Sequence, residues 1–189
     1  ETQCVKTAEY YLSLLLKDED ISVGASLLEL GSKQGDLLLQ AIQKGIRVTG
    51  FEFSEELAKV VVDRIGNNGQ VIAGDVEKLF ETTQQFDYII LNDILQKVYD
   101  PKKILQKIYQ LLKKDGKILI VIPSLDSVSA RVMKKKWIEF KPDRFWYFSN
   151  TTLSRLLYSL NFCQIKMSQA NKAMNIECFY KSLKYYPAA

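Results

Sequence analysis

Two acidic residues and two glycines near the N-terminus are the part of the chain best suited to hold a ligand. Glu29 closes an apolar run, and Gly31 and Gly35 follow it in a short turn that leads into a second apolar run. Another acid, Glu52, closes the next strand pattern about 20 residues further on, the spacing at which a carboxylate reaches ribose hydroxyls. Glycines in such a turn let a ligand approach the backbone closely. The pattern predicts an adenosine-containing cofactor, contacted by Glu29, Gly31, Ser32, Gly35 and Glu52.

The residues around the turn favour S-adenosylmethionine over a dinucleotide. A dinucleotide site uses Gly-x-Gly-x-x-Gly because the pyrophosphate lies against backbone N–H groups. Here Lys33 stands at the middle glycine position, and the carboxylate of Glu29 precedes the turn. A carboxylate suits an α-amino group, which it can bind directly or through water. The competing interpretation is a turn that merely needs glycine, beside a solvated charge at a strand end.

Polar residues follow two later strand patterns as well. Asp75 could accept a hydrogen bond from an adenine amino group and the Val76 N–H could serve a ring nitrogen, although Asp75 could instead cap a short helix over residues 76–80. Phe53 could lie against the adenine or simply pack. Backbone carbonyls near Asn92 could hold the methionine part of the cofactor, and Asp93 could face the acceptor, although both are common turn formers.

Strand and helix patterns alternate along the chain. This alternation predicts an α/β fold, a Rossmann-like doubly wound three-layer αβα sandwich with a mostly parallel sheet. Ligands bind such sheets at the carboxyl ends of the strands, where all the residues named above lie. We expect a single domain over residues 1–189. The expected strands are 26–30, 47–51, 70–73, 86–91, 117–122, 162–167 and 176–180, and the expected helices are 1–20, 36–44, 54–65, 100–114 and 150–160.

A long irregular stretch, the 124–149 segment, is a candidate substrate lid. Cations and aromatic residues alternate in it, which suits an anionic or sugar-like acceptor, or a nucleic-acid surface. A third interpretation, a solvated basic helix whose aromatic residues cover the core, is favoured over either of these two functions taken alone. If the acceptor is a hydroxyl, Asp93 or Tyr147 could take its proton.

Composition excludes several kinds of site. The chain of 189 residues has no histidine, so His-ligated zinc, Ser–His triads and imidazole bases are excluded, and we expect no metal site. A net charge of +4 is too small to indicate a nucleic-acid partner, and no apolar run reaches membrane-spanning length. Three dispersed cysteines indicate a reducing, cytoplasmic setting, with most of them buried.

Together these residues resemble the class I S-adenosylmethionine-dependent methyltransferases, and most of all the small bacterial enzymes related to ubiquinone-biosynthesis O-methyltransferases. The resemblance covers about residues 27–162 and rests on motifs in order: Glu29-Leu30-Gly31 with Gly35, then residues 48–54, 72–75, 86–91, 111–117 and 146–149. It implies a seven-stranded sheet whose last strand is antiparallel. It also implies cofactor contacts at Glu29, Gly31, Glu52, Asp75 and around Asn92.

The sequence departs from that family where substrate chemistry is expected. Relatives often carry Leu-Glu-His after the fourth strand, where this chain has Leu95-Gln96-Lys97, and Arg144 replaces a histidine common before the late aromatic segment. We therefore expect methyl transfer to a small-molecule, glycan or lipid-linked acceptor, with no histidine or metal role carried over. The alternatives are an NAD(P)-dependent oxidoreductase and a non-catalytic S-adenosylmethionine-binding module.

Overall fold

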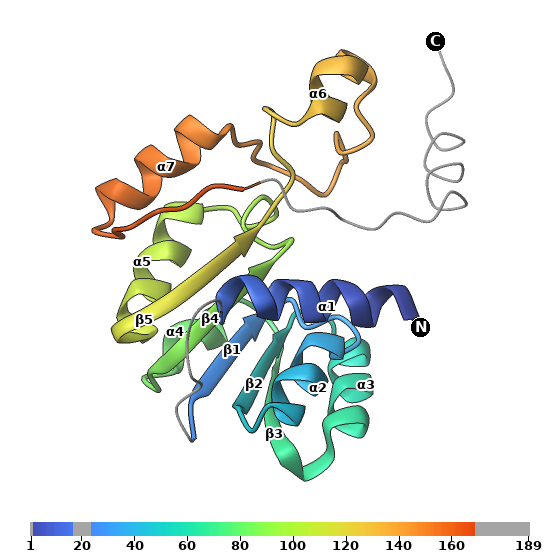
Figure 1. Cartoon of the computed structure of the whole chain (residues 1–189), viewed down its shortest axis with the longest axis vertical. Helices are drawn as coiled ribbons and strands as arrows, with labels where there is room; N and C mark the ends of the chain where they lie inside the picture. Colours follow the sequence, from blue (N-terminus) through green and yellow to red (C-terminus); the bar gives the residue numbers. More distant parts are fainter. Residues whose placement is uncertain (1, 17–23, 169–189) are drawn as a thin grey trace.

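The computed structural model describes residues 2–16 and 24–168, in which five parallel strands form one sheet in the order β3-β2-β1-β4-β5 (Figure 1). The order reverses between β1 and β4, and in open α/β sheets ligands bind beside such a reversal, outside the carboxyl ends of the strands. The strands are β1 (Ser26–Leu30), β2 (Arg47–Glu52), β3 (Gly69–Ala73), β4 (Phe86–Asn92) and β5 (Leu112–Val121).

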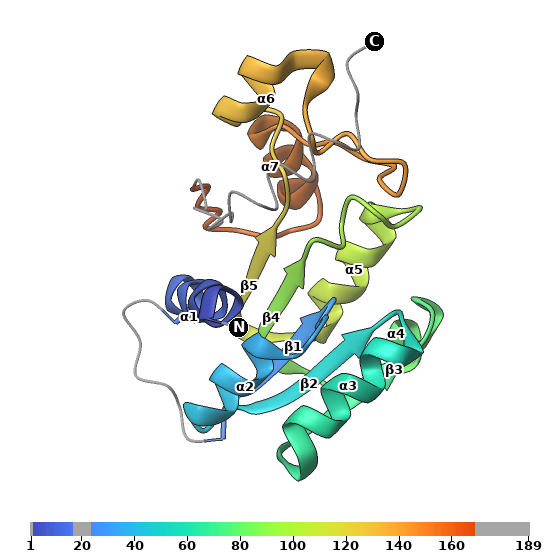
Figure 2. The same ribbon diagram turned by 90° about the vertical axis from the view of Figure 1, so that its right-hand side faces the viewer.

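Helices cover both faces of the sheet. One apolar core lies beneath α1, α2 and α3, and the other beneath α4, α5 and α7. Figure 2 shows α1 and α2 on one side of the strands and α4 and α5 on the other, which confirms the three-layer arrangement. The helices are α1 (Thr2–Leu15), α2 (Asp36–Gln43), α3 (Glu55–Ile65), α4 (Glu77–Glu81), α5 (Pro101–Leu111), α6 (Val128–Met133) and α7 (Asn150–Ser159).

Side chains that cap helix starts explain where several helices begin. The Ser54 hydroxyl accepts the N–H of Leu57 at 3.3 Å, as expected for the cap of α3. Asp100 accepts the N–H of Lys103 at 2.9 Å and is followed by proline, which needs no partner for a backbone N–H at the first helical position. α3 therefore starts shortly after β2 ends, and α5 starts after the loop that follows β4.

Three sequence predictions differ from the structure. The helix expected over residues 100–114 ends at Leu111, because Leu112 already pairs with Phe86 as the first residue of β5. The strand expected over residues 162–167 is absent: that stretch lies outside the ladders, and its Phe162 packs edge-on against Tyr109 at 5.3 Å. Cys4 and Cys163 are exposed free thiols, so the expectation that most cysteines are buried is wrong for the two described.

The other C-terminal strand expected, residues 176–180, lies outside the described residues, as does part of the helix expected over residues 1–20. The described sheet therefore contains five strands, all parallel. In the described part of the chain, no helix is long and apolar enough to cross a membrane.

The 124–149 segment has structure of its own. Its ends meet in a bridge between Ser124 and Phe148, and the Leu125 N–H donates to the Phe148 carbonyl at 2.9 Å. Between them the chain forms α6 and a 3₁₀ turn (Lys134–Lys136), which stand above the carboxyl end of β5 in Figure 1. Trp137 is buried beneath this turn, so the segment is folded onto its own aromatic side chain.

Candidate functional site

Three polar side chains converge where β1, β2 and β4 end. In each strand alternate residues point to opposite faces, and Glu29, Glu52 and Asn92 fall on the face covered by α1, α2 and α3. Glu29 pairs in register with Gly50 of β2 and with Ile90 of β4, so the two other polar residues lie just beyond it on neighbouring strands. Glu29 and Glu52 therefore lie close together at the carboxyl-end edge of the sheet, as predicted.

The glycine-rich turn packs tightly between these strand ends. Gly31 has φ 82°, and a Cβ there would lie 2.8 Å from the Ile94 side chain and 2.9 Å from the Asn92 carbonyl oxygen. Its N–H donates to the Phe51 carbonyl at 2.8 Å, and the buried Ser32 hydroxyl lies 3.3 Å from the same oxygen. Gly35, with φ 78°, caps α2 in the left-handed conformation. Both glycines are required by the backbone, and the hydroxyl predicted as a cofactor contact bonds to the protein itself.

Glu52 joins the end of β2 to the glycine-rich turn. One carboxylate oxygen accepts the Lys33 N–H at 2.7 Å and the other accepts the Ser54 N–H at 3.2 Å. The residue is only 5% exposed. A carboxylate has about four acceptor positions, so two backbone bonds leave each oxygen able to accept another donor. The side chain is thus held in one orientation with capacity for a ligand.

Glu29 is the most unusual residue of the site. It is 1% exposed, and among the described residues its Oε2 atom has no hydrogen-bond partner. Burial raises the pKa of its carboxyl group to about 8. A hydrogen bond from the Asn92 side chain and the charge of Lys33 lower this pKa in part, and the charges of Glu52 and Asp36 raise it further. A buried acceptor without a donor is costly. The site therefore favours a ligand that brings a positively charged N–H donor to Glu29.

The end of β3 contributes a more open region. Gly74 donates its N–H to the Glu52 carbonyl at 3.0 Å, which places Asp75 directly beyond the end of β2. Asp75 is exposed, and α4 begins after Val76, whose side chain makes no cap hydrogen bond. The alternative that Asp75 caps this helix is therefore not supported, because the residue at the cap position of α4 is Val76. Phe53 packs edge-on against Phe51 at 5.3 Å, with part of its surface exposed.

A second polar cluster lies on the other side of Asn92. Asp93 adopts a positive φ of 64°, and its Oδ1 atom accepts from Gln96 Nε2 and, at 3.2 Å, from Arg144 Nη2. Arg144, with 3% of its side chain exposed, also donates to the carboxylate of Glu139 and lies in the 124–149 segment. Among the described residues, Gln96 Oε1 and Arg144 Nε are buried without partners. The cluster ties the segment to the end of β4.

Backbone bonds reinforce this connection. The Gln96 carbonyl accepts the N–H groups of Phe145 at 2.9 Å and Trp146 at 3.2 Å, and the Trp146 indole donates to the Val98 carbonyl at 3.0 Å. Tyr147 lies nearby in the sequence, but its hydroxyl accepts the Lys141 N–H at 3.1 Å within the segment. Asp93 and Tyr147 thus bond to different partners, and no hydrogen bond between them is found in the described structure.

Sequence reasoning did not assign a role to Glu139, Gln96 or Arg144. The signal for Gln96 and Arg144 was present in the two departures from the family pattern, at the run after β4 and before the late aromatic segment, whereas no pattern in the sequence pointed to Glu139. Read together, these departures place a new amide and a new guanidinium in contact with the same aspartate, Asp93. No group of three potential metal ligands forms a site in residues 2–16 and 24–168.

Comparisons with known proteins agree with this geometry. The model of a family described as a methyltransferase domain matches residues 6–165. An uncharacterized protein of Methanocaldococcus jannaschii is 30% identical over 64% of this chain and 58% of its own length. The ubiquinone biosynthesis O-methyltransferase of Coxiella burnetii is 32% identical over 50% of this chain and 42% of its own length.

A solved structure has the same fold. Phosphoethanolamine N-methyltransferase 2 from Haemonchus contortus, in complex with S-adenosyl-L-methionine, superposes with a TM-score of 0.64 at 22% identity, over 94% of this chain and 41% of its own. The chain spans between 26% and 58% of the length of four curated relatives. The family model nevertheless covers most of the chain, from before β1 to beyond α7. The chain therefore belongs to the methyltransferase domain family.

Proposed function

We propose that the chain is an S-adenosylmethionine-dependent methyltransferase that acts on a small-molecule, glycan or lipid-linked acceptor. The observation that carries the proposal is the buried Oε2 atom of Glu29, which has no hydrogen-bond partner among the described residues. The α-amino group of S-adenosylmethionine is a cationic donor of the kind this atom lacks. Pyrophosphate would bring negative charge to the same place, which disfavours the nicotinamide alternative.

The residues at the strand ends fit the other parts of the same cofactor. Glu52 keeps acceptor capacity for ribose hydroxyls while two backbone N–H groups hold it in place. Gly31 and Gly35 carry no side chain, so the cofactor could approach the backbone of the turn closely. The adenine would be met by Phe53, Asp75 and the Val76 N–H, and the methionine part by Asn92.

The cofactor supplies a methyl group already activated on a sulfonium, so the protein chiefly has to align the acceptor and exclude water. Positioning of this kind is worth roughly 7–11 kcal/mol. Asp93 and Tyr147 are the proposed proton acceptors for a hydroxyl substrate. Asp93 Oδ1 is engaged by Arg144, whereas Oδ2 faces only Lys97 Nζ, at 3.8 Å, among the salt bridges found. We assign the proton-accepting role to Oδ2.

Two further expectations belong to this proposal. We also expect a seven-stranded sheet with an antiparallel last strand, because β5 lies at the edge of the described sheet and is half-buried over most of its length. A reducing, cytoplasmic setting is supported by the two exposed free thiols, Cys4 and Cys163. The partner expected at the site is a small-molecule acceptor rather than a nucleic acid.

Isothermal titration calorimetry with S-adenosylhomocysteine tests cofactor binding. The wild type should bind, and Glu52→Ala should weaken the affinity roughly 10–100-fold because charge-assisted hydrogen bonds are lost. Glu56→Ala, an exposed acid on α3, is the matched control and should bind as the wild type does. No binding at millimolar ligand, or equal affinity in Glu52→Ala, would contradict the proposal.

Proton release gives a second readout specific to Glu29. Burial holds a proton on this carboxyl at neutral pH, because its pKa is raised to about 8. A bound ammonium group stabilises the ionised form, so ligand binding at pH 7 should release up to one proton. Titrations in buffers of different ionisation enthalpy measure that release, and Glu29→Gln should abolish it.

A further inference from the structure

The end of the molecule formed by α6 and the 3₁₀ turn after it exposes apolar and cationic side chains together. Val128 is 67% exposed and Val132 is 74% exposed, more than the other exposed aliphatic residues of the described chain. They are four residues apart on α6, so they share one face of the helix. We define the α6 patch by its exposed apolar and cationic residues: Val128, Arg131, Val132, Lys134, Lys135 and Lys136.

The patch is strongly basic for its size. Residues 128–136 contain four cations and no acid, while the whole chain has a net charge of only +4. The nearest acid before them, Asp126, accepts the Asn150 N–H at 2.7 Å and is only half-exposed. The positive charge of the patch is therefore concentrated locally and is not cancelled within α6 or the turn.

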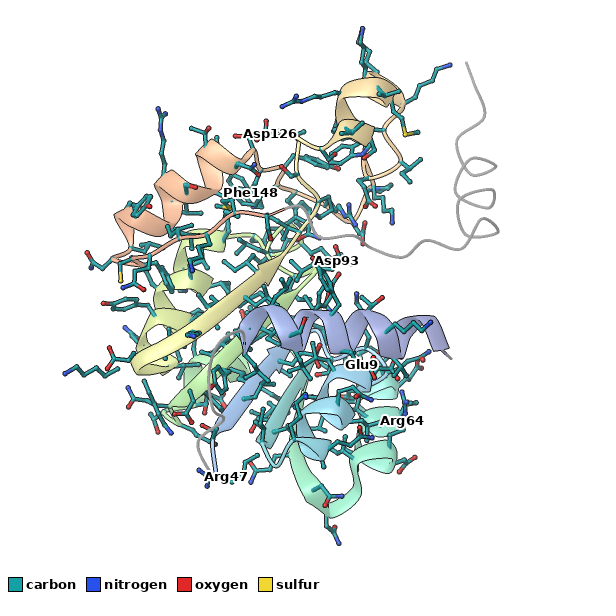
Figure 3. All side chains as sticks on the ribbon, viewed as in Figure 1. Glu9, Arg47, Arg64, Asp93, Asp126 and Phe148 are labelled. Carbon is teal, nitrogen blue, oxygen red and sulfur yellow. The ribbon has the colours of Figure 1, made fainter. Side chains whose placement is uncertain are left out.

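The α6 patch is supported by packed side chains around Trp137. Trp137, directly after the turn, is 3% exposed, and its indole N–H donates to the Ser129 hydroxyl at 3.1 Å. Its ring meets Phe140 edge-on at 5.4 Å. Figures 1 and 2 both place α6 at the end of the molecule remote from β2 and β3, and in Figure 3 long side chains project outward from it. The two valines are thus presented to solvent by a packed support.

We propose that the α6 patch docks onto an anionic membrane surface. Valine side chains gain by entering the boundary between headgroups and acyl chains, and lysine and arginine gain from the negative surface potential of anionic lipids. A nucleic acid would match the charge but would leave both valines in water, and the patch itself has no aromatic ring for base stacking. The combination of exposed aliphatic residues and cations therefore favours a lipid surface.

Docking would bring the candidate acceptor site to that surface. The patch belongs to the same 124–149 segment whose Arg144 contacts Asp93 at the end of β4. If the proposed methyl transfer is correct, on which this step alone rests, the acceptor is an amphiphile taken from the bilayer. This selects the lipid-linked class among the acceptors proposed above.

Vesicle cosedimentation tests the docking with the full chain and without any cofactor. Vesicles of phosphatidylcholine with about 30 mol% phosphatidylglycerol should bind the protein at least tenfold more tightly than phosphatidylcholine alone. Binding should weaken as salt rises, because the attraction is screened. A single-stranded oligonucleotide provides the competing arm, and binding to it without binding to vesicles would overturn the proposal.

Two sets of variants separate the contribution of the patch lysines from that of the two valines expected to enter the membrane. The triple change Lys134→Gln, Lys135→Gln and Lys136→Gln should weaken vesicle binding about tenfold or more. The double change Val128→Ser and Val132→Ser should weaken it about fivefold at unchanged charge. Wild-type binding in either variant would overturn the proposal.

The chain offers a matched control for each set. For charge, three exposed lysines elsewhere are replaced together: Lys44→Gln, Lys59→Gln and Lys114→Gln. For apolar surface, the exposed α3 valines are replaced: Val60→Ser and Val62→Ser. Both controls should bind vesicles as the wild type does, and a loss equal to that of the patch variants would overturn the proposal. Because S-adenosylhomocysteine binding is measured separately, failure of docking and failure of the proposed function are distinguishable.

Discussion

The carboxylate of Glu52 accepts the backbone N–H of Lys33 at 2.7 Å, so the end of β2 is bonded directly to the glycine-rich turn after β1. Two segments 19 residues apart in sequence are thereby fixed relative to one another. The acid expected to hold the ribose also shapes the turn that surrounds the cofactor.

Replacing Glu52 by Ala should therefore loosen the turn even without ligand. The Lys33 and Ser54 N–H groups both lose their acceptor, and each lost bond to a charged group is worth about 1.5–3 kcal/mol. Hydrogen exchange followed by mass spectrometry should show faster exchange in the turn, with the amides of α5 unchanged. Equal protection of the turn in both proteins would mean that the bond contributes little.

Glu29 should make the ligand-free protein less stable as pH rises. Burial raises its pKa from 4.5 to about 8, so between these values the unfolded chain loses this proton and the folded protein keeps it. Stability is then lost progressively across that window, at about 1.4 kcal/mol per pH unit and on the order of 5 kcal/mol in total. Urea unfolding at pH 5 and pH 8 measures the difference, and Glu29→Gln should remove most of it.

Gly31→Ala should destabilise the fold by more than backbone strain alone. A left-handed residue with a side chain costs about 1–2 kcal/mol, and here the added carbon would also lie 2.8 Å from the Ile94 side chain. Gly45→Ala is the control, because Gly45 has φ 75° with no atom within 4 Å of the added carbon. Thermal unfolding should show a clearly larger loss of stability for Gly31→Ala than for Gly45→Ala. Equal losses of stability would mean that the contact with Ile94 adds nothing to the backbone strain.

Arg144→Met should release the 124–149 segment. The change leaves Asp93 and Glu139 without their buried cation, and breaking a buried ion pair on one side costs about 3–5 kcal/mol. Limited trypsin digestion should cut the segment at residues 134–136 faster than in the wild type. Lys141→Gln removes a weaker, exposed contact to the same glutamate, at 3.9 Å, and should leave the digestion rate unchanged.

The parts of the structure that local sequence determines were predictable. The strand ends at Leu30 and Glu52, the glycine-rich turn, and the caps at Ser54 and Asp100 all depend on neighbouring residues, and the structure has each of them. The position of a strand in a sheet depends on a partner, which is why the stretch 162–167 was expected in the sheet and is not there.

The Arg144 cluster could not be predicted for a similar reason. Its contact with Asp93 joins residues 51 apart in sequence, and no periodic pattern links them. Burial of a cysteine is likewise decided by tertiary packing, so composition misled at Cys4 and Cys163. Roles of single residues in the candidate site, including Asp93 and Tyr147, stay predictions.

The bridge between Ser124 and Phe148 makes the 124–149 segment a closed loop whose two ends leave the body of the protein side by side. A longer, shorter or unrelated insert can span the same two points without moving β5 or α7. Changes of sequence within this segment can therefore alter its shape while the strand ends at Glu29 and Glu52 keep their positions.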